Sequence, residues 1–216
     1  MIFIGMKYLL SLLLLISFTV SAQDTVTITH KAYKTTFSKS KHYPVKVEWW
    51  LTRAMLNCST KVKRTDNFGP DPKLLQHTNL QADYNASGYD RGHIFPAADG
   101  ACDIVKMTES FYFSNMTPQT PQLNRGDWKS LEEMTREESL KYDSLYIWAG
   151  SVGVAKKIGT TSVPKQCWKV IYNKRMNTYE AFLFENNGSK ADGLKNNEVP
   201  VSVVEQITGF KFKINK

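Results

Sequence analysis

Cysteine and histidine are scarce in this chain, which narrows the kinds of site that it can build. Its 216 residues include three cysteines and four histidines. No two cysteines stand in a C-x-x-C arrangement, so a structural zinc site is not expected. Cys58, Cys102 and Cys167 form an odd set. They allow one disulfide with one spare thiol, and the sequence does not say which two cysteines pair.

Long apolar runs are absent beyond the first residues. Lys7 precedes the apolar run LLSLLLLISF, and small residues follow at Val20, Ser21 and Ala22. The run is well short of the ~20 apolar residues that a membrane-spanning helix needs. We therefore interpret residues 1–22 as a secretory signal peptide that is cleaved after Ala22, and we predict a secreted or periplasmic protein. No cysteine follows the cleavage point, so a lipid anchor is not indicated.

Internal repeats and low-complexity linkers are also absent, so we expect residues 23–216 to form a single domain. The formal net charge of the whole chain is +8, and because Lys7 is the only charged residue of the signal segment, the mature protein carries +7. Such an excess favours polyanionic partners, namely nucleic acid, acidic glycans or an anionic membrane. Charge alone does not choose among them.

Hydrophobic patterning predicts a mixed α+β domain. A helix is expected from about Asn124 to Tyr142, with Trp128 and Leu131 on its buried side, and a short helix over 202–210 that Gly209 ends. Residues 57–88 read as a long irregular crossing with a basic KVKR stretch at 61–64. Strands are expected at 26–30, 46–56, 111–115, 145–152, 167–173 and 179–185.

The segment YDRGHIFPAAD at 89–99 contains the residues most suggestive of chemistry. A neutral imidazole at His93 can accept a proton from water. If the segment is extended, Arg91 projects to the same side, where its guanidinium suits an anionic phosphate. Gly92 lets backbone or substrate approach closely. The alternative is a surface histidine beside an Asp–Arg pair, because a D-R-G-H tetrapeptide alone is a weak motif.

A second segment, FYFSNMTPQTPQLNRGDWKSLE at 111–132, favours the catalytic interpretation of His93 over the surface interpretation. Together with YDRGHIFPAAD it closely resembles the DNA/RNA non-specific endonuclease family of the ββα-metal (His-Me finger) nucleases, which includes secreted bacterial nucleases and mitochondrial endonuclease G. The resemblance extends more weakly to the R-x-D-x-F stretch at 64–68 and to the strands as far as about residue 185. It implies antiparallel sheet layers flanked by helices, with a ββα-metal finger as the active site.

The resemblance implies a role for each matching residue. His93 is the expected general base that activates water. Asn124 is the expected single protein ligand of a Mg²⁺ ion, for which Mn²⁺ is a substitute, and this fits the preference of magnesium for oxygen ligands and retained water. Glu132 is expected to orient the metal-bound waters, and Arg91 to hold the scissile phosphate.

Three further residues receive lesser roles from the resemblance. Arg64 is expected to be a second phosphate-facing arginine, Asn115 to support the site, and Asp90 to anchor its own loop. Other interpretations stay open, since Asn124 also suits a helix N-cap, Asn115 a turn or an unused glycosylation sequon, and Glu132 a solvated carboxylate. Arg64 also suits a solvated basic patch.

The implied activity is Mg²⁺-dependent, sequence-independent hydrolysis of phosphodiester bonds in DNA and RNA, leaving 5′-phosphate and 3′-hydroxyl ends. Basic residues that touch phosphates supply affinity without reading bases. An alternative is a catalytically inactive extracellular nucleic-acid-binding protein of the same fold, and another is a secreted adhesin or glycan binder. The oligomeric state stays open, with a homodimer among the alternatives. The candidate phosphate contacts are Lys61, Lys63, Arg64, Arg125 and Lys129.

Overall fold

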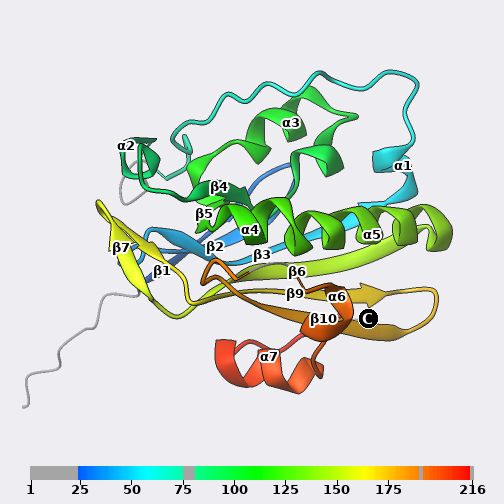
Figure 1. Cartoon of the computed structure of the whole chain (residues 1–216). Helices are drawn as coiled ribbons and strands as arrows, with labels where there is room; N and C mark the ends of the chain where they lie inside the picture. The colour runs from blue at the N-terminus through cyan, green and yellow to red at the C-terminus, as the bar shows by residue number, and fades with distance from the viewer. Residues whose placement is uncertain (1–23, 75–80, 190–191, 215–216) are drawn as a thin grey trace, which may run out of the picture.

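The computed structural model describes residues 24–74, 81–189 and 192–214 (Figure 1). The predicted signal peptide, residues 1–22, lies outside the described residues. Within the described part of the chain, no helix is both long and apolar enough to cross a bilayer.

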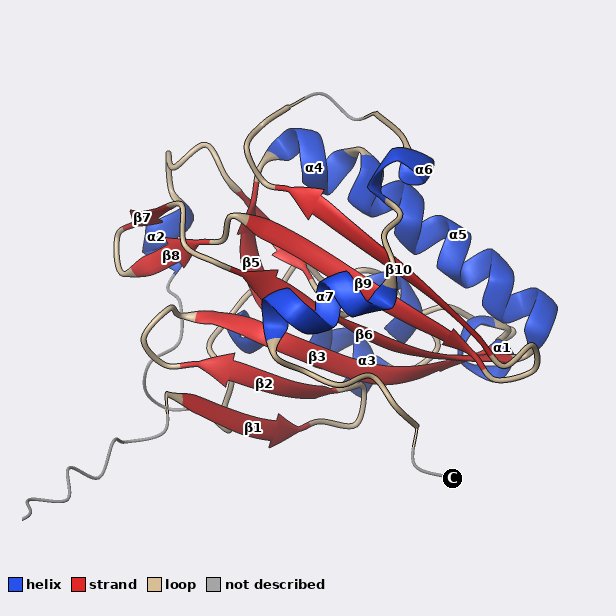
Figure 2. Cartoon of the chain, turned by 90° about the horizontal axis from the view of Figure 1, so that it is seen from below, coloured by secondary structure: helices blue, strands red, loops and turns tan. Residues whose placement is uncertain are grey.

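A six-stranded antiparallel sheet runs through the molecule, with the strand order β1-β2-β3-β6-β9-β10 (Figure 2). Alternation places the side chains of each strand on two faces, and in the central strands both faces are apolar. In β6, for example, Ile147 lies in one buried cluster and Trp148 in another. The sheet must therefore be covered on both sides. Its strands are β1 (Thr25–Thr29), β2 (Lys34–Ser38), β3 (Tyr43–Thr52), β6 (Ser144–Val152), β9 (Gln166–Asn173) and β10 (Thr178–Glu185).

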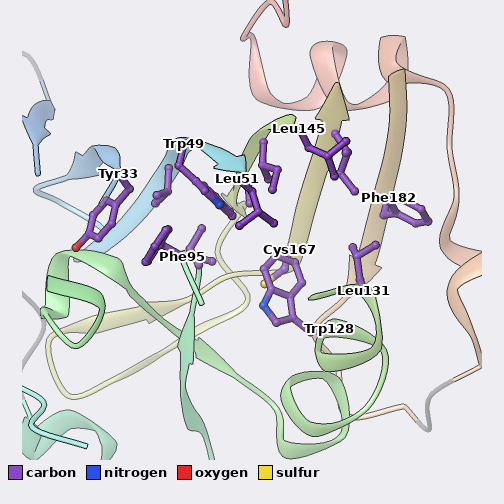
Figure 3. Packing of buried hydrophobic residues seen from close by; sticks show 14 of the residues in the cluster. Tyr33, Trp49, Leu51, Phe95, Trp128, Leu131, Leu145, Cys167 and Phe182 are labelled. Atoms are coloured by element: carbon purple, nitrogen blue, oxygen red, sulfur yellow. The ribbon is translucent and has the colours of Figure 1, made fainter. Parts of the chain in front are cut away.

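The first face packs against the long helix α5 (Asp127–Tyr142), which lies along the sheet in Figure 1. Trp128 and Leu131 of this helix are 1% and 0% exposed, as the sequence predicts for its buried side. Figure 3 shows both side chains directed toward the strands, where Leu145 and Phe182 belong to the same cluster. This packing holds the first turns of α5 rigidly against the sheet.

The second face is covered by α7 (Val201–Thr208) and the segment that follows it. Gly209 ends α7 in the left-handed conformation with φ of 73°, as its position in the sequence indicates. Phe212 then packs against Trp148 and Trp168. The described part of the basic tail KFKINK is therefore attached to the sheet face opposite α5.

A second group of elements lies on the α5 side of the sheet (Figure 1). Within it, β4 and β5 form an antiparallel pair in which His93 lies opposite Met116. Gly92 is required there, because a Cβ atom at this position would lie 2.2 Å from Oε1 of the buried Gln119. The group comprises α1 (Arg53–Leu56), α2 (Gln81–Tyr84), β4 (Asp90–His93), η1 (Ala97–Gly100), α3 (Ile104–Ser110), η2 (Phe113–Asn115), β5 (Met116–Gln119) and α4 (Pro121–Arg125).

The remaining elements lie at the periphery of the sheet. They are the hairpin of β7 (Lys156–Ile158) and β8 (Thr161–Val163) and the short helix α6 (Leu194–Asn197).

The α+β class with an antiparallel sheet is confirmed, and three predicted elements need correction. The strand expected over 46–56 ends at Thr52, because the Thr52 side chain accepts a hydrogen bond from the Met55 amide and caps α1. The strand expected at 111–115 is replaced by the 3₁₀ turn η2, whose Asn115 turns inward. The helix expected over 124–142 is two helices, α4 and α5, separated at Gly126.

A disulfide joins Cys58 to Cys102, and Cys167 is free and buried. The bridge ties the beginning of the predicted irregular crossing to the turn before α3. Nearby, the Val62 amide donates to the Ala101 carbonyl at 2.7 Å. The crossing is therefore attached where it passes over the α5 side of the molecule, and a short helix, α2, interrupts it before β4.

Candidate active site

An open cleft of about 360 Å³ lies where β4, the crossing segment and the helices α4 and α5 meet. Five of the six residues selected from the sequence line it, namely Arg64, Arg91, His93, Asn124 and Glu132. They come from a loop, a strand and two helices that are far apart in the sequence. The other lining residues are Pro96, Ala97, Ala98, Arg125 and Lys129.

Two phenylalanine rings hold the histidine and both arginines in place. Phe68 has its ring centroid 5.5 Å from that of His93 and 4.0 Å from the Arg91 guanidinium carbon. Phe111 lies 5.0 Å from His93 and 4.9 Å from the Arg64 guanidinium carbon. The two rings contact each other edge to face at 4.9 Å. Aromatic faces attract guanidinium groups, so this pair fixes three cleft side chains at once.

The environment of His93 keeps its imidazole neutral. Burial and the positive charges of Arg64 and Arg91 lower its pKa to about 3, while Asp66 acts in the opposite direction. Nε2 has no hydrogen-bond partner among the described residues and is almost inaccessible to solvent. The nitrogen therefore offers a lone pair at neutral pH.

The R-x-D-x-F stretch places Arg64 next to the histidine. Nε of Arg64 donates to Oδ1 of Asp66 at 2.7 Å, and both side chains are more than half exposed. Arg91 donates from Nη1 to Oε1 of Gln81 at 2.7 Å. Among the described residues, neither arginine forms an ion pair with a buried carboxylate, so both can exchange these exposed contacts for a phosphate.

Asn124 is held by Asp90. Its Nδ2 donates to Oδ2 of Asp90 at 2.9 Å, and the same carboxylate accepts two hydrogen bonds from Arg125 at 2.8 and 2.7 Å. The Arg125 and Asn124 hydrogen bonds lower the pKa of Asp90 and keep it ionised although it is partly buried. With Nδ2 committed to Asp90, the Asn124 carbonyl oxygen is the atom that remains for a ligand.

Asp90 thus anchors α4 rather than its own loop, and Asn124 is not a helix N-cap. Asn124 lies inside α4, whose N-cap is Thr120, and α5 has Gly126 at its N-cap.

Glu132 lies one helical turn beyond Trp128 on α5 and lines the cleft. Burial raises the pKa of its carboxyl to about 7, and nearby Asp99 adds to this effect. Lys169, Arg136 and the Trp128 indole act in the opposite direction. This glutamate is therefore poised between its protonated and ionised forms, unlike an ordinary solvated carboxylate.

Asn115 is the selected residue that does not line the cleft. It is fully buried, and its Oδ1 accepts from the Phe95 amide at 2.8 Å. Its Nδ2 donates to the carbonyl oxygens of Phe95 and Ser110 at 2.9 and 2.8 Å. These contacts brace the chain just after His93, and they leave the sequon at Asn115 inaccessible in the folded protein.

The sequence did not predict the positions of two residues behind the cleft, Trp128 and Lys169. Trp128, expected only in the core, also donates from Nε1 to the His93 carbonyl oxygen at 3.1 Å. Lys169 lies buried with its Nζ 4.5 Å from the Trp128 ring centroid. A lysine between buried apolar positions of a predicted strand was the available signal, because a charged side chain is seldom buried without a specific partner.

The oxygen donors that line the cleft fit a hydrated divalent metal ion. Among the described residues, no group of three or more histidine, cysteine, aspartate or glutamate side chains is arranged to hold a metal. Magnesium keeps several waters and is satisfied by one or two protein oxygens plus phosphate. The Asn124 carbonyl oxygen fits that requirement as a single protein oxygen, and the Glu132 carboxylate lines the same cleft.

The antiparallel pair β4–β5, followed by α4 and α5, with a histidine on the first strand and an asparagine on the helical side, is the ββα-metal arrangement of metal-dependent nucleases. Residues 13–216 match the model of the DNA/RNA non-specific endonuclease family, and the chain belongs to that family. It is accordingly an endonuclease that hydrolyses phosphodiester bonds.

Individual relatives come from several kinds of organism. The chain is 30% identical to a nuclease of Nostoc sp. over 89% of its own length and 74% of that protein. It is 31% identical to a nuclease of Serratia marcescens, over 74% of its own length and 66% of that protein.

A mitochondrial relative and a solved structure extend the comparison. The chain is 32% identical to the mitochondrial nuclease 1 of Schizosaccharomyces pombe, over 85% of its own length and 64% of that protein. A solved structure of a complex of EndoG with EndoGI is similar in fold, with a TM-score of 0.76 and 26% identity, covering 86% of this chain and 84% of that one. The family therefore includes bacterial and mitochondrial proteins.

Proposed function

We propose that this chain is a secreted, Mg²⁺-dependent nuclease that cleaves DNA and RNA without sequence preference, with His93 as its general base. The observation that carries the proposal is the neutral imidazole of His93 in a cleft shared with two arginines and Asn124. A neutral imidazole removes a proton from water, and guanidinium groups beside it bind the phosphate that the water attacks.

The reaction proceeds by in-line hydrolysis at phosphorus. A water molecule gives a proton to Nε2 of His93 as its oxygen bonds to phosphorus, and the bond from phosphorus to the 3′ oxygen breaks. The leaving 3′ oxygen takes a proton from solvent water, and His93 later releases its proton to solvent, so the products carry 5′-phosphate and 3′-hydroxyl ends. Arg91 and Arg64 hold the phosphate oxygens. Because the phosphate neutralises their charge, its binding raises the pKa of His93 and makes the imidazole a stronger base when substrate is present.

Asn124 would hold the magnesium ion through its carbonyl oxygen, and the ion would stabilise negative charge at the phosphate and on the leaving 3′ oxygen. Asp90 fixes the orientation of that carboxamide. Glu132, once ionised, accepts hydrogen bonds from waters in the cleft and orients them. Asn115 keeps the chain beyond His93 in position.

Cleavage without sequence preference follows from the character of the cleft and its rim. The exposed side chains around it are mainly basic, and contacts to phosphate carry no base information. Arg64, Arg125 and Lys129 line the cleft, and Lys61 and Lys63 are exposed on the segment that leads to Arg64.

Two features support secretion. The sequence over residues 7–22 has the basic, apolar and small-residue order of a signal peptide. The Cys58–Cys102 disulfide is the second feature, because disulfides persist chiefly in oxidising compartments.

Digestion of plasmid DNA and of RNA by the purified mature protein tests the proposal, with Mg²⁺ and with EDTA. We expect both substrates to be cut only with the metal, and His93→Ala to remove cleavage while retaining DNA binding and the melting temperature. End-labelling of the products should reveal 5′-phosphates. Wild-type protein that binds but never cuts would support the inactive binding protein instead, and activity of His93→Ala would reject the base assignment.

A further inference from the structure

Residues 57–74 of the irregular crossing form no helix or strand, yet they carry Arg64, which lines the cleft, and Phe68, which packs beside it. The segment passes over α3 (Figure 1). The disulfide between Cys58 and Cys102 attaches its first end. Because a segment without regular backbone hydrogen bonds opens easily, it needs a second attachment to keep Phe68 in place.

Asp71 supplies this second attachment. It is fully buried, and both of its carboxylate oxygens are used. Oδ2 accepts a hydrogen bond from Oγ of Ser114 and lies 2.8 Å from Nε2 of His30, whereas Oδ1 accepts from the Lys73 amide at 2.8 Å. Burial acts to raise the pKa of this carboxyl, but these hydrogen bonds outweigh burial and lower the pKa. An ionised Asp71 therefore joins the crossing to η2 and to the turn after β1.

The turn that carries His30 is itself held by Glu109 of α3. The Glu109 carboxylate accepts hydrogen bonds from the Lys31 and Ala32 amides at 3.1 and 2.8 Å. Its Oε1 lies 3.7 Å from Nδ1 of His30. The histidine ring thus lies between two carboxylates, with Asp71 at Nε2 and Glu109 at Nδ1. Since all three side chains are buried, the attachment belongs to the interior of the protein and not to its surface.

A short stretch of backbone leads from Asp71 to Phe68. Between them, the carbonyl oxygen of Gly69 accepts a hydrogen bond from the Phe113 amide at 2.9 Å. The Gly69 amide donates to the carbonyl oxygen of Phe111 at 3.3 Å. The stretch 111–114 therefore contacts both Gly69 and Asp71, and Phe68 is fixed at the point where the crossing meets it.

Phe68 is the contact through which this attachment reaches the cleft. Its ring centroid lies 4.0 Å from the guanidinium carbon of Arg91 and 5.5 Å from the ring centroid of His93. We propose that Asp71 is a positioning residue that holds Phe68 against Arg91 and so fixes the guanidinium group that receives the phosphate. Asp71 contacts neither the substrate nor the reacting atoms. The inference rests on the proposed function for the role of Arg91 in turnover, whereas the placement of Phe68 against Arg91 does not depend on activity.

The first measurement is spectroscopic and needs no substrate. A ring centred 4.0 Å from the guanidinium carbon displaces the NMR frequency of the Nε proton of Arg91, whose signal is assigned by its loss in Arg91→Lys. The displacement should be lost in Phe68→Ala, and the signal should move in the same direction in Asp71→Asn. Tyr43→Phe is the control, because it removes a buried hydrogen bond, to the Gly153 carbonyl oxygen, that involves no cleft residue. It should leave the signal unchanged.

Kinetics supply the second measurement, as a double-mutant cycle. We expect kcat/KM for DNA to fall by about tenfold or more in Asp71→Asn, because a small displacement of a substrate-positioning group has an effect of this order. If Asp71 acts through Phe68, Asp71→Asn should cause almost no further loss in protein that already carries Phe68→Ala. Tyr43→Phe should leave kcat/KM unchanged with and without Phe68→Ala.

An unmoved Arg91 signal in folded Asp71→Asn overturns the inference, and so does an additive loss in the cycle. If Asp71→Asn does not fold, Ser114→Ala, which removes one donor and keeps the carboxylate, replaces it in both measurements with the same expected directions. If neither variant folds, Asp71 is structural only, and the inference is rejected. Inactive wild-type protein would instead reject the proposed function, and the NMR result would still decide the role of Asp71.

Discussion

The carboxylate of Asp90 and the carboxamide of Asn124 are joined by a hydrogen bond of 2.9 Å, from Nδ2 to Oδ2. Asp90, in β4, thereby determines that the carbonyl oxygen of Asn124, in α4, faces away from it. The orientation follows from chemistry, since an ionised carboxylate only accepts hydrogen bonds and the amide nitrogen only donates. The carbonyl oxygen of Asn124 consequently faces away from Asp90, and it is the atom that we propose binds the metal ion.

Asp90→Ala should weaken the metal site without removing the base. We expect the Mg²⁺ concentration for half-maximal activity to rise by about 10–100-fold, the usual effect of losing a group that orients a metal ligand. A magnesium titration of initial rates measures this. Arg125→Ala is the matched control, because it removes the other partner of Asp90 and leaves the Asn124 contact in place. Equal magnesium dependence in both variants would contradict the assigned role of Asp90.

The decrease of kcat/KM at low pH should follow the protonation of Glu132 and not that of His93. The pKa of His93 is lowered to about 3, so its imidazole is already neutral at pH 5 in the free enzyme. The pKa of Glu132 is raised to about 7, so its carboxylate is lost as the pH falls through this value. We expect kcat/KM to decline below about pH 7 at low Mg²⁺, and the limb to move to lower pH as Mg²⁺ rises, because a nearby cation favours the carboxylate.

Glu132→Gln provides the control for that profile. Its residual activity should lack the limb near pH 7 and decline only at much lower pH. If the limb persists unchanged in this variant, another group controls it.

Loss of the Cys58–Cys102 disulfide should destabilise the fold and loosen the segment that carries Arg64. For a sequence separation of 44 residues, loop-closure entropy corresponds to roughly 3–4 kcal/mol of unfolding free energy. Urea unfolding of Cys58→Ala/Cys102→Ala should show a loss of this order, and kcat/KM should fall because Arg64 is less well held. Cys167→Ala controls for thiol removal, since Cys167 is not bridged. A double variant with wild-type stability would refute the expectation.

Salt dependence should reveal the basic rim of the cleft. Binding of His93→Ala protein to duplex DNA in EDTA should weaken steeply with salt, because each phosphate contact releases counterions. Adding Lys129→Ala should reduce the slope of log K against log salt by about 0.9. Lys174→Ala, in the exposed turn between β9 and β10, should leave the slope unchanged. Equal slopes for Lys129→Ala and Lys174→Ala would show that the rim does not contact the phosphates.

Much of the fold could be predicted from local patterns. Strands β6, β9 and β10 and helix α7 lie where periodicity and turn residues place them, because each depends on neighbours within a few residues. The strand predicted at 111–115 was wrong. The side chain of Asn115 faces inward and forms hydrogen bonds with the backbone of Phe95 and Ser110, which an alternating sequence pattern does not reveal. β2, α3 and the β7–β8 hairpin were missed for lack of a strong periodic signal.

By itself, the sequence determined the chemistry that is available: one histidine with two arginines, an asparagine and a glutamate at recognisable spacings. Tertiary structure alone decided how these groups act on one another. It paired Cys58 with Cys102, oriented the Asn124 carboxamide through its hydrogen bond to Asp90, and buried Lys169 against the Trp128 ring. The physical reason is that pKa values and hydrogen-bond partners depend on distance and burial in space, and these contacts join segments that lie tens of residues apart in the chain.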